Sequence, residues 1–136
     1  MIEATSEAPS WPKSAWDGFL DGLAAEQRLL LLADDTNGET CGLLVATSVA
    51  GETELESLLV SSRYRRRGAG RALLTAWLEW AARGQARRAF LEVRASNRAA
   101  VRLYESLDFQ VTGLRSSYYN DPPEDALLMA RQVVVP

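Results

Sequence analysis

Apolar residues along this chain of 136 residues change their spacing near residue 61. Before that point, apolar segments at 27–33, 41–50 and 54–60 are separated by short polar stretches. The Asn37-Gly38 pair between the first two favours a tight hairpin turn. This half of the chain therefore predicts three strands in an antiparallel meander.

Helical spacing replaces this pattern in later segments. The apolar positions that carry it are Leu73, Leu74, Trp77, Leu78 and Ala81 in one segment, and Val101, Leu103, Tyr104 and Leu107 in another. Gly84 would cap the end of the first helix, and Ser96 or Asn97 the start of the second. A shorter helix is predicted at 16–23.

Three more strands are expected at 89–93, 109–114 and 126–135, the last two joined by a loop through 121–123. A helix between the strands at 54–60 and 89–93 favours parallel pairing of these two strands. The pattern predicts an α/β (α+β) fold with a mixed, mostly antiparallel twisted sheet flanked by helices. Residues 1–10 are expected to form a loose tail and 11–136 a single domain.

Composition limits the catalytic mechanisms and metal sites that this chain can have. The chain contains no histidine and a single cysteine, Cys41, which excludes Ser-His-Asp and Cys-His mechanisms, and no metal site is expected. Cys41 lies in a strand-like run and is expected to be a buried thiol. A net charge of −3 and an acidic start without a signal-peptide pattern favour a cytoplasmic protein that binds neither membrane nor nucleic acid.

A basic, glycine-containing loop lies between the third strand and the first long helix. It reads Arg65-Arg66-Arg67-Gly68-Ala69-Gly70-Arg71, and five arginines fall within residues 63–71. Exposed amides at a helix start bind anions, and glycines let the backbone approach a pyrophosphate. A diphosphate site is the favoured interpretation. The alternatives are a solvated basic turn or a nucleic-acid patch, although only Tyr64 supplies the aromatic character that such a patch would need.

A second motif follows at 91–109, with the sequence LEVRASNRAAVRLYESLDF. Together with the arginine-glycine loop it resembles the GNAT superfamily of N-acetyltransferases, and more narrowly the bacterial ribosomal-protein-alanine N-acetyltransferases. The resemblance runs from about residue 11 to residue 132 and is strongest at 58–71 and 91–109. It implies acetyl-CoA as cofactor, a protein N-terminus as acceptor, and a ribosomal protein as one possible partner.

The resemblance also implies roles for individual residues. The cofactor contacts it implies are the backbone of Leu58, Leu59 and Val60, the loop Arg65 to Arg71, and Asn97. Glu92 would be the general base and Tyr104 the general acid. From the residues alone, Glu92 could instead pair with Arg94 or Arg98, and Tyr104 could simply pack on the sheet.

The part of the chain that would bind the acceptor matches that family less closely. Tyr118 and Tyr119 would form one wall of the acceptor groove, or they could be packing residues of an exposed hairpin. Asp108 stands where the family usually has glycine. The family's first strand and helix are expected to be missing, because only ten residues precede Trp11. The exposed sheet edge that results could pair with a second copy of the chain.

Three functions remain open at this point. The first is an N-acetyltransferase that modifies a protein N-terminal amine. The second is a relative that acetylates a small amine or a lysine side chain. The third is a module that binds acetyl-CoA without turnover.

Overall fold

The computed structural model describes residues 27–64, 68–119 and 123–134. Its elements are β2 (Gln27–Asp34), β3 (Thr40–Val49), β4 (Glu52–Val60), the 3-10 turn η1 (Ser62–Tyr64), α3 (Ala69–Arg83), β5 (Arg88–Arg94), α4 (Arg98–Ser106), β6 (Gln110–Tyr119) and β7 (Glu124–Gln132). Both long helices and all six predicted strands are present. The predictions for 1–10, for the helix at 16–23 and for the missing first strand and helix lie outside the described residues.

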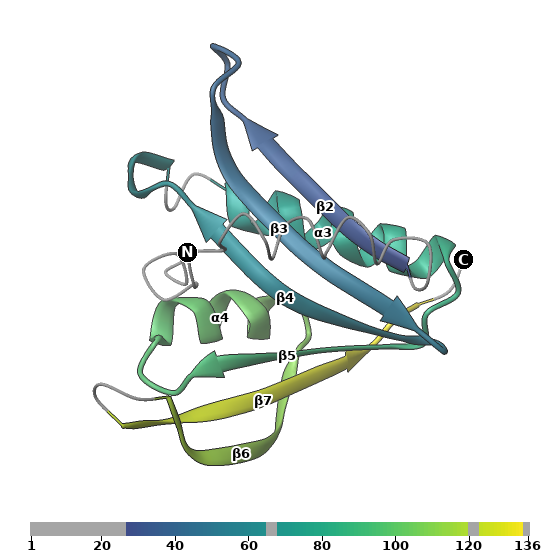
Figure 1. Cartoon of the computed structure of the whole chain (residues 1–136), viewed down its shortest axis with the longest axis vertical. Coiled ribbons are helices and arrows are strands. Elements are labelled where there is room, and N and C mark those ends of the chain that lie inside the picture. The colour runs from purple at the N-terminus through teal and green to yellow at the C-terminus, as the bar shows by residue number, and fades with distance from the viewer. Residues whose placement is uncertain (1–26, 65–67, 120–122, 135–136) are drawn as a thin grey trace, which may run out of the picture.

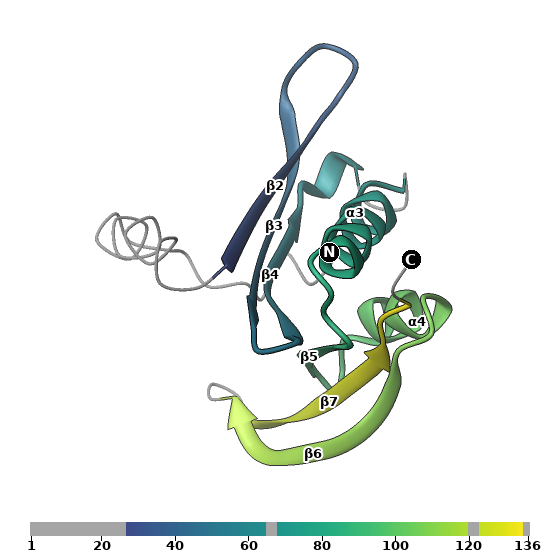
Figure 2. The same cartoon turned by 90° about the vertical axis from the view of Figure 1, so that its right-hand side faces the viewer.

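The six strands form one sheet in the order β2-β3-β4-β5-β7-β6. Among the strands that the structure describes, only the β4–β5 pair is parallel, and every other neighbouring pair is antiparallel. Figures 1 and 2 show the strong twist that this sheet accumulates from β2 to β6. The predicted mixed sheet is confirmed, including the parallel pair on either side of α3.

Helices α3 and α4 pack on the same face of the sheet (Figure 2). Trp77 of α3 is fully buried at their centre, where its ring stacks on that of Phe109 with centroids 6.0 Å apart. The indole Nε1 donates a hydrogen bond to Thr53 Oγ1 at 2.9 Å. A buried tryptophan usually needs such a partner for its N–H, and Thr53 on β4 provides it. This contact fixes α3 against the strand that carries the candidate cofactor site.

The turn between β2 and β3 is broader than the two-residue hairpin that Asn37-Gly38 suggested. Asp35 organises it, because one carboxylate oxygen accepts hydrogen bonds from the backbone N–H groups of Asn37 and Glu39 at 2.8 and 2.9 Å. The other oxygen accepts one from the Tyr64 hydroxyl, and this bond is the main reason that the pKa of the Asp35 carboxyl lies below its usual value. An aspartate that satisfies loop amides in this way favours the wider loop.

Two chain reversals near the helices use left-handed residues that are not glycine. Gly84 caps α3 as predicted but has φ −82°, and the left-handed conformation falls on Gln85, with φ 66°. Asp108, where the related family usually has glycine, has φ 71°. Aspartate tolerates this region better than most residues, so the turn into β6 is preserved.

One expectation from the composition can be compared directly with the structure. Cys41 is buried, as expected for a structural thiol. No helix in the described part of the chain is both long and apolar enough to span a bilayer.

Candidate active site

The two parallel strands β4 and β5 separate after three paired positions. Their register pairs Glu52 with Arg88, Thr53 with Ala89 and Glu54 with Phe90, and then ends. Figure 1 shows the two strands diverging beyond this point. Among the described strands, none pairs with the edge of β4 that faces this opening. Unpaired strand N–H and C=O groups can bind a ligand that lies along the edge.

A β-bulge changes which side chains face the core in the part of β4 that borders the opening. The register with β3 shifts between Val45 and Ala46, which leaves Glu56 as the extra residue of β4. Leu55 before the bulge and Leu58 after it both belong to the core under the helices, so the alternation of faces is reset between them. Bulges of this kind are common beside active sites. The backbone of 58–60, predicted to bind the cofactor, follows directly.

The start of α3 lies at the end of this segment. Gly68 caps the helix in a left-handed conformation, with φ 85° and no side-chain hydrogen bond to the first turn. A Cβ on Gly70 would lie 3.4 Å from Leu103 Cδ2 and 3.8 Å from Val60 Cγ2, so the helix start is close to both β4 and α4. The amides of the first turn lie at the positive end of the helix dipole, which suits a diphosphate. Arg65, Arg66 and Arg67 lie outside the described residues.

The side chain of Arg71 forms its hydrogen bond to α4. Its Nη2 donates to Ser106 Oγ at 2.7 Å, and Ser106 Oγ donates to the carbonyl of Leu103 at 2.6 Å. The side chain thus connects α3 to the end of α4. A role for Arg71 in cofactor binding remains a prediction for its backbone amide.

The two polar atoms of the Asn97 side chain, Oδ1 and Nδ2, can serve different functions. Its Oδ1 accepts a hydrogen bond from Ala100 N at 3.2 Å and caps α4, as one of the two predicted cap residues. The side chain is only 9% exposed, yet its buried Nδ2 has no hydrogen-bond partner. A buried donor left without a partner costs about 1–3 kcal/mol. Nδ2 is therefore available to a ligand that enters beside the start of α4.

Glu92 lies in the middle of β5, on the face opposite the helices, because its neighbours Leu91 and Val93 both face the core. Its predicted alternative partners were Arg94 and Arg98. The structure pairs Glu92 instead with Arg115 of β6, with Nη1 and Oε1 3.4 Å apart. Arg94 pairs with Glu124 at 3.3 Å.

Tyr104 lies on the other face of the sheet, the face that the helices cover. It lies on α4 with only 3% of its surface exposed, and its ring packs edge-on against Phe109 with centroids 6.1 Å apart. Tyr104 therefore packs in the core, as the alternative interpretation of this residue proposed. Its role as a general acid is still a prediction. Glu92 and Tyr104 lie on opposite faces of the sheet, on elements that follow one another directly. An acceptor on one face and a thioester donor on the other could meet at the opening.

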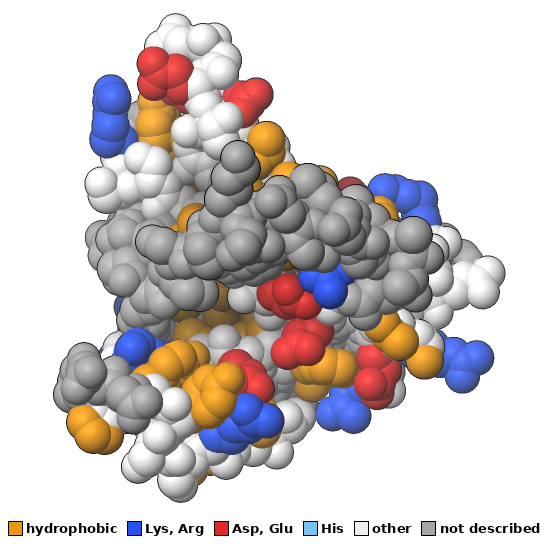
Figure 3. Space-filling model, viewed as in Figure 1, with side chains coloured by type: hydrophobic (Ala, Val, Ile, Leu, Met, Phe, Trp, Pro, Cys, Tyr) orange, Lys and Arg blue, Asp and Glu red, His pale blue; other side chains and the backbone are white. Residues whose placement is uncertain are grey.

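Sequence reasoning missed one acidic residue of this region, Glu54. It occupies the last paired position of β4, and its partner Phe90 precedes Glu92 by two residues on the same face. Burial raises the pKa of the Glu54 carboxyl, the neighbouring charges of Glu56 and Glu92 raise it further, and Arg115 opposes them. Figure 3 shows acidic side chains gathered near the middle of this face. The alternating acids in the segment Glu52-Thr53-Glu54-Leu55-Glu56 were the available signal.

Tyr118 and Tyr119 lie near the end of β6, with their rings edge-on and centroids 5.1 Å apart. Each ring carries a guanidinium: Arg115 lies 5.0 Å from the centroid of Tyr118, and Arg94 lies 4.2 Å from that of Tyr119. Tyr118 is 47% exposed. The tyrosines are thus connected to Glu92 through Arg115, but whether they contact an acceptor remains a prediction.

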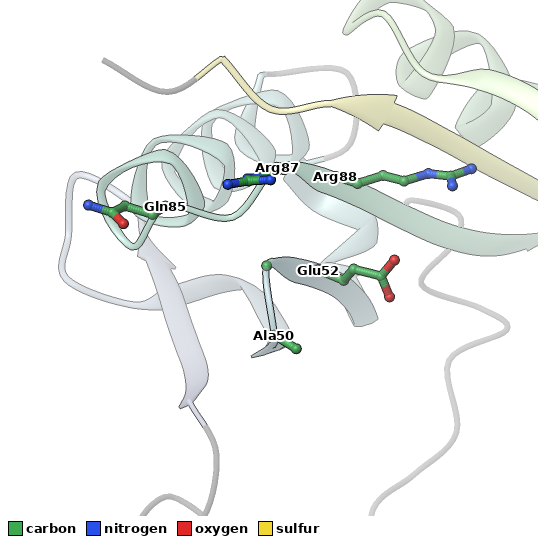
Figure 4. Close-up of a pocket in the computed structure, with 6 residues that line it drawn as sticks. Ala50, Glu52, Gln85, Arg87 and Arg88 are labelled. Atoms are coloured by element: carbon green, nitrogen blue, oxygen red, sulfur yellow. The ribbon is translucent and has the colours of Figure 1, made fainter.

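A shallow hollow of about 410 Å³ lies elsewhere, at the paired end of β4 and β5 (Figure 4). Ala50, Gly51, Glu52, Gln85, Arg87 and Arg88 line it. It lies beside the β3–β4 turn, whereas Glu92 and the start of α3 border the other end of the strand pair. The hollow is therefore separate from the opening between β4 and β5.

Comparison with known proteins agrees with this arrangement. The family model of the acetyltransferase (GNAT) family matches residues 2–109. The chain belongs to this family. Its fold and the opening between two parallel strands thus define a GNAT-type protein.

Individual relatives show which members of this family the chain resembles. The [ribosomal protein bS18]-alanine N-acetyltransferase of Escherichia coli (strain K12) is 40% identical over 96 residues, which are 69% of this chain and 65% of that protein. The Salmonella typhimurium enzyme of the same name is 38% identical over 132 residues, or 96% of this chain and 86% of that protein. The crystal structure of the ribosomal-protein-S18-alanine N-acetyltransferase from Escherichia coli superposes with a TM-score of 0.78 at 31% identity, covering 98% of this chain and 86% of that one.

Proposed function

We propose that this protein is an acetyl-CoA-dependent N-acetyltransferase that modifies the N-terminal α-amine of a protein, with an N-terminal alanine of a ribosomal protein as the first candidate. The observation that carries the proposal is the opening between β4 and β5, bordered by a bulged strand edge and the start of α3. The names of the relatives support the choice of acceptor.

The described residues fit acetyl-CoA in three ways. The edge of β4 at Leu58, Leu59 and Val60 has backbone groups to bind an extended pantetheine arm. The amides from Gly68 to Arg71 suit a diphosphate, and a left-handed glycine in open space begins them. The buried Nδ2 of Asn97 needs an acceptor atom. When bound, acetyl-CoA supplies an acetyl group activated as a thioester.

Transfer to an amine requires a base, an oxyanion donor and a proton for the departing sulfur. Glu92 takes a proton from the acceptor amine, directly or through one water. A backbone amide within 58–60 stabilises the negative oxygen as the amine attacks. The Tyr104 hydroxyl gives its proton to the sulfur as the carbon–sulfur bond breaks, which leaves a neutral amide and a neutral thiol. The protonated Glu92 and the deprotonated Tyr104 then exchange protons with solvent, which restores the starting state.

An N-terminal amine suits this site better than a lysine side chain. A protein N-terminus titrates near ~7.7–8.0 and lysine near ~10.4, so at cellular pH only the former is substantially neutral. Glu92 is partly exposed and forms an ion pair with Arg115. A modest base is sufficient for an amine that is already partly neutral.

Acetyl-CoA turnover on two matched peptides tests the proposal. One peptide begins with a free alanine and contains no lysine, and the other has the same sequence with a blocked N-terminus and one internal lysine. We expect acetylation of the first only, detected by mass spectrometry, with turnover strongly reduced in Glu92→Gln and Tyr104→Phe. Acetylation of the lysine peptide or of a polyamine alone would indicate another acceptor class. Binding of acetyl-CoA without turnover on any amine would indicate a non-catalytic module.

A further inference from the structure

Arg115 connects three groups on the face where an acceptor would approach. Its guanidinium forms the 3.4 Å ion pair with Glu92 and lies over the Tyr118 ring at 5.0 Å. Its charge also acts on Glu54, whose pKa it tends to lower against the effects of burial and of neighbouring acids. The candidate base, a second carboxylate and the candidate peptide wall therefore share one cation.

The fold builds this connection through a wide bulge in β6. Arg115 pairs with Ala126 and Tyr119 pairs with Glu124, so three residues of β6 oppose one residue of β7. Ser117, at the centre of the bulge, has a left-handed φ of 53°, and its N–H donates to Asp125 Oδ1 at 2.8 Å. The bulge interrupts the usual alternation of strand side chains and allows Tyr118 to lie against Arg115.

The sheet register explains why Arg115 reaches Glu92. Arg115 pairs with Ala126 of β7, and Ala126 pairs in turn with Arg94 of β5. Glu92 is two residues before Arg94 on the same face, so a long side chain from β6 can cross β7 to the carboxylate. The contribution of this contact to folding is small, because the Arg115 side chain is 53% exposed and exposed ion pairs add little stability.

We propose that Arg115 is a positioning residue of the acceptor site, which holds the Glu92 carboxylate and the Tyr118 ring in one arrangement so that a peptide lying against Tyr118 presents its amine to Glu92. This inference rests on the proposed function. A guanidinium suits both contacts, since its plane stacks on a ring while its edge pairs with a carboxylate.

The test compares steady-state kinetics of Arg115→Gln, Arg115→Lys, Glu92→Gln and the double variant Glu92→Gln/Arg115→Gln with the wild type. The peptide that begins with alanine is the acceptor, and acetyl-CoA affinity is measured separately by calorimetry. Arg102→Gln is the matched control, because Arg102 is an exposed arginine of α4.

We expect Arg115→Gln to lower kcat/KM for the peptide by about 10-fold or more, because misplacing a reacting group by 1 Å can cost about 100-fold. Acetyl-CoA affinity and the melting temperature should remain near those of Arg102→Gln. Arg115→Lys keeps the charge but loses the planar group that stacks on Tyr118. Its kcat should therefore lie closer to the wild-type value than its KM for the peptide does. In the Glu92→Gln background, removing Arg115 should change the residual kcat by less than about 2-fold, while the increase in the KM for the peptide that follows loss of the Tyr118 contact should remain.

Three outcomes overturn the inference. If Arg115→Gln is as active as Arg102→Gln while the wild type turns over normally, Arg115 positions nothing and the proposed function stands. If the losses in kcat from Glu92→Gln and Arg115→Gln multiply, the two residues act independently and the coupling is refuted. Absence of wild-type turnover on every peptide would overturn both the proposed function and the role of Arg115.

Discussion

Asn97 allows a separation of its structural role from its ligand-binding role, because each belongs to a different atom. Oδ1 caps α4, and Nδ2 is buried without a partner. Replacement by alanine removes both atoms, and replacement by serine keeps a capping oxygen while removing the donor. Replacement by aspartate keeps the cap and places a carboxylate where the donor was.

The expected changes in stability follow from the cap. Asn97→Ala should lower the free energy of unfolding by about 1 kcal/mol, within a range of about 0.5–2, as loss of an N-cap does. For a chain of 136 residues this corresponds to a fall in melting temperature of about 3–4 °C. Asn97→Ser should be at least as stable as the wild type, because it retains a capping oxygen and buries no unpaired N–H₂. Asn97→Asp should be less stable than Asn97→Ser, because its second carboxylate oxygen lies buried without a partner.

The expected changes in acetyl-CoA affinity follow a different order. Loss of a hydrogen bond worth about 0.5–1.5 kcal/mol weakens binding by about 2–13-fold, and this applies equally to Asn97→Ala and Asn97→Ser. Asn97→Asp should bind weakest, since its carboxylate repels an anionic ligand. Thermal denaturation and calorimetric titration measure the two quantities, with the exposed-loop variant Asn37→Ser as control. Wild-type affinity in Asn97→Ser would refute a donor role for Nδ2.

Three further predictions concern other parts of the site and its support. Gly68→Ala and Gly38→Ala change glycines with nearly the same φ, 85° and 83°, and open space around both. Each should cost about 1–2 kcal/mol of stability, but only Gly68→Ala should weaken acetyl-CoA binding in calorimetry; equal affinities would contradict the assignment of the α3 start. Trp77→Phe should destabilise the protein by about 1–3 kcal/mol in urea unfolding, and the loss should be smaller in a Thr53→Val background; purely additive losses would show that the indole bond to Thr53 contributes little. The raised pKa of Glu54 favours its protonated form in the folded state, so its contribution to stability is present below the unfolded pKa near 4.5 and is lost as pH rises through the folded pKa. Glu54→Gln should therefore be more stable than the wild type at pH 7, and this advantage should disappear toward pH 4 in thermal denaturation; an advantage independent of pH would contradict burial as the cause.

The arrangement of strands and helices could be predicted because periodicity and connection rules act locally. The positions Leu73, Leu74 and Trp77 fixed one face of α3, and a helix between two strands implied the parallel pair β4–β5. Asn97 was one of two equally suitable cap residues, and only the structure distinguishes it from Ser96.

Features that depend on pairing across the sheet could not be predicted in this way. The alternative considered for Glu92 was an ion pair with Arg94 or Arg98, but its partner is Arg115, which requires the strand order β5-β7-β6. The extension of β6 to Tyr119 was also missed, because a bulge at 116–118 interrupts the alternation that marks a strand. The bulge at Glu56 has the same cause, since one additional residue leaves no distinct sequence pattern.

The central claim is that acetyl-CoA binds in the opening between β4 and β5, and amide chemical shifts measured during its titration test this claim most directly. We predict that the largest changes fall on the backbone amides of 58–60 and 68–71 and on the side-chain amide of Asn97. The amides of Gly51, Glu52 and Arg88 beside the separate hollow should remain nearly unchanged. Shifts concentrated at that hollow, or no saturable shifts at all, would contradict the account.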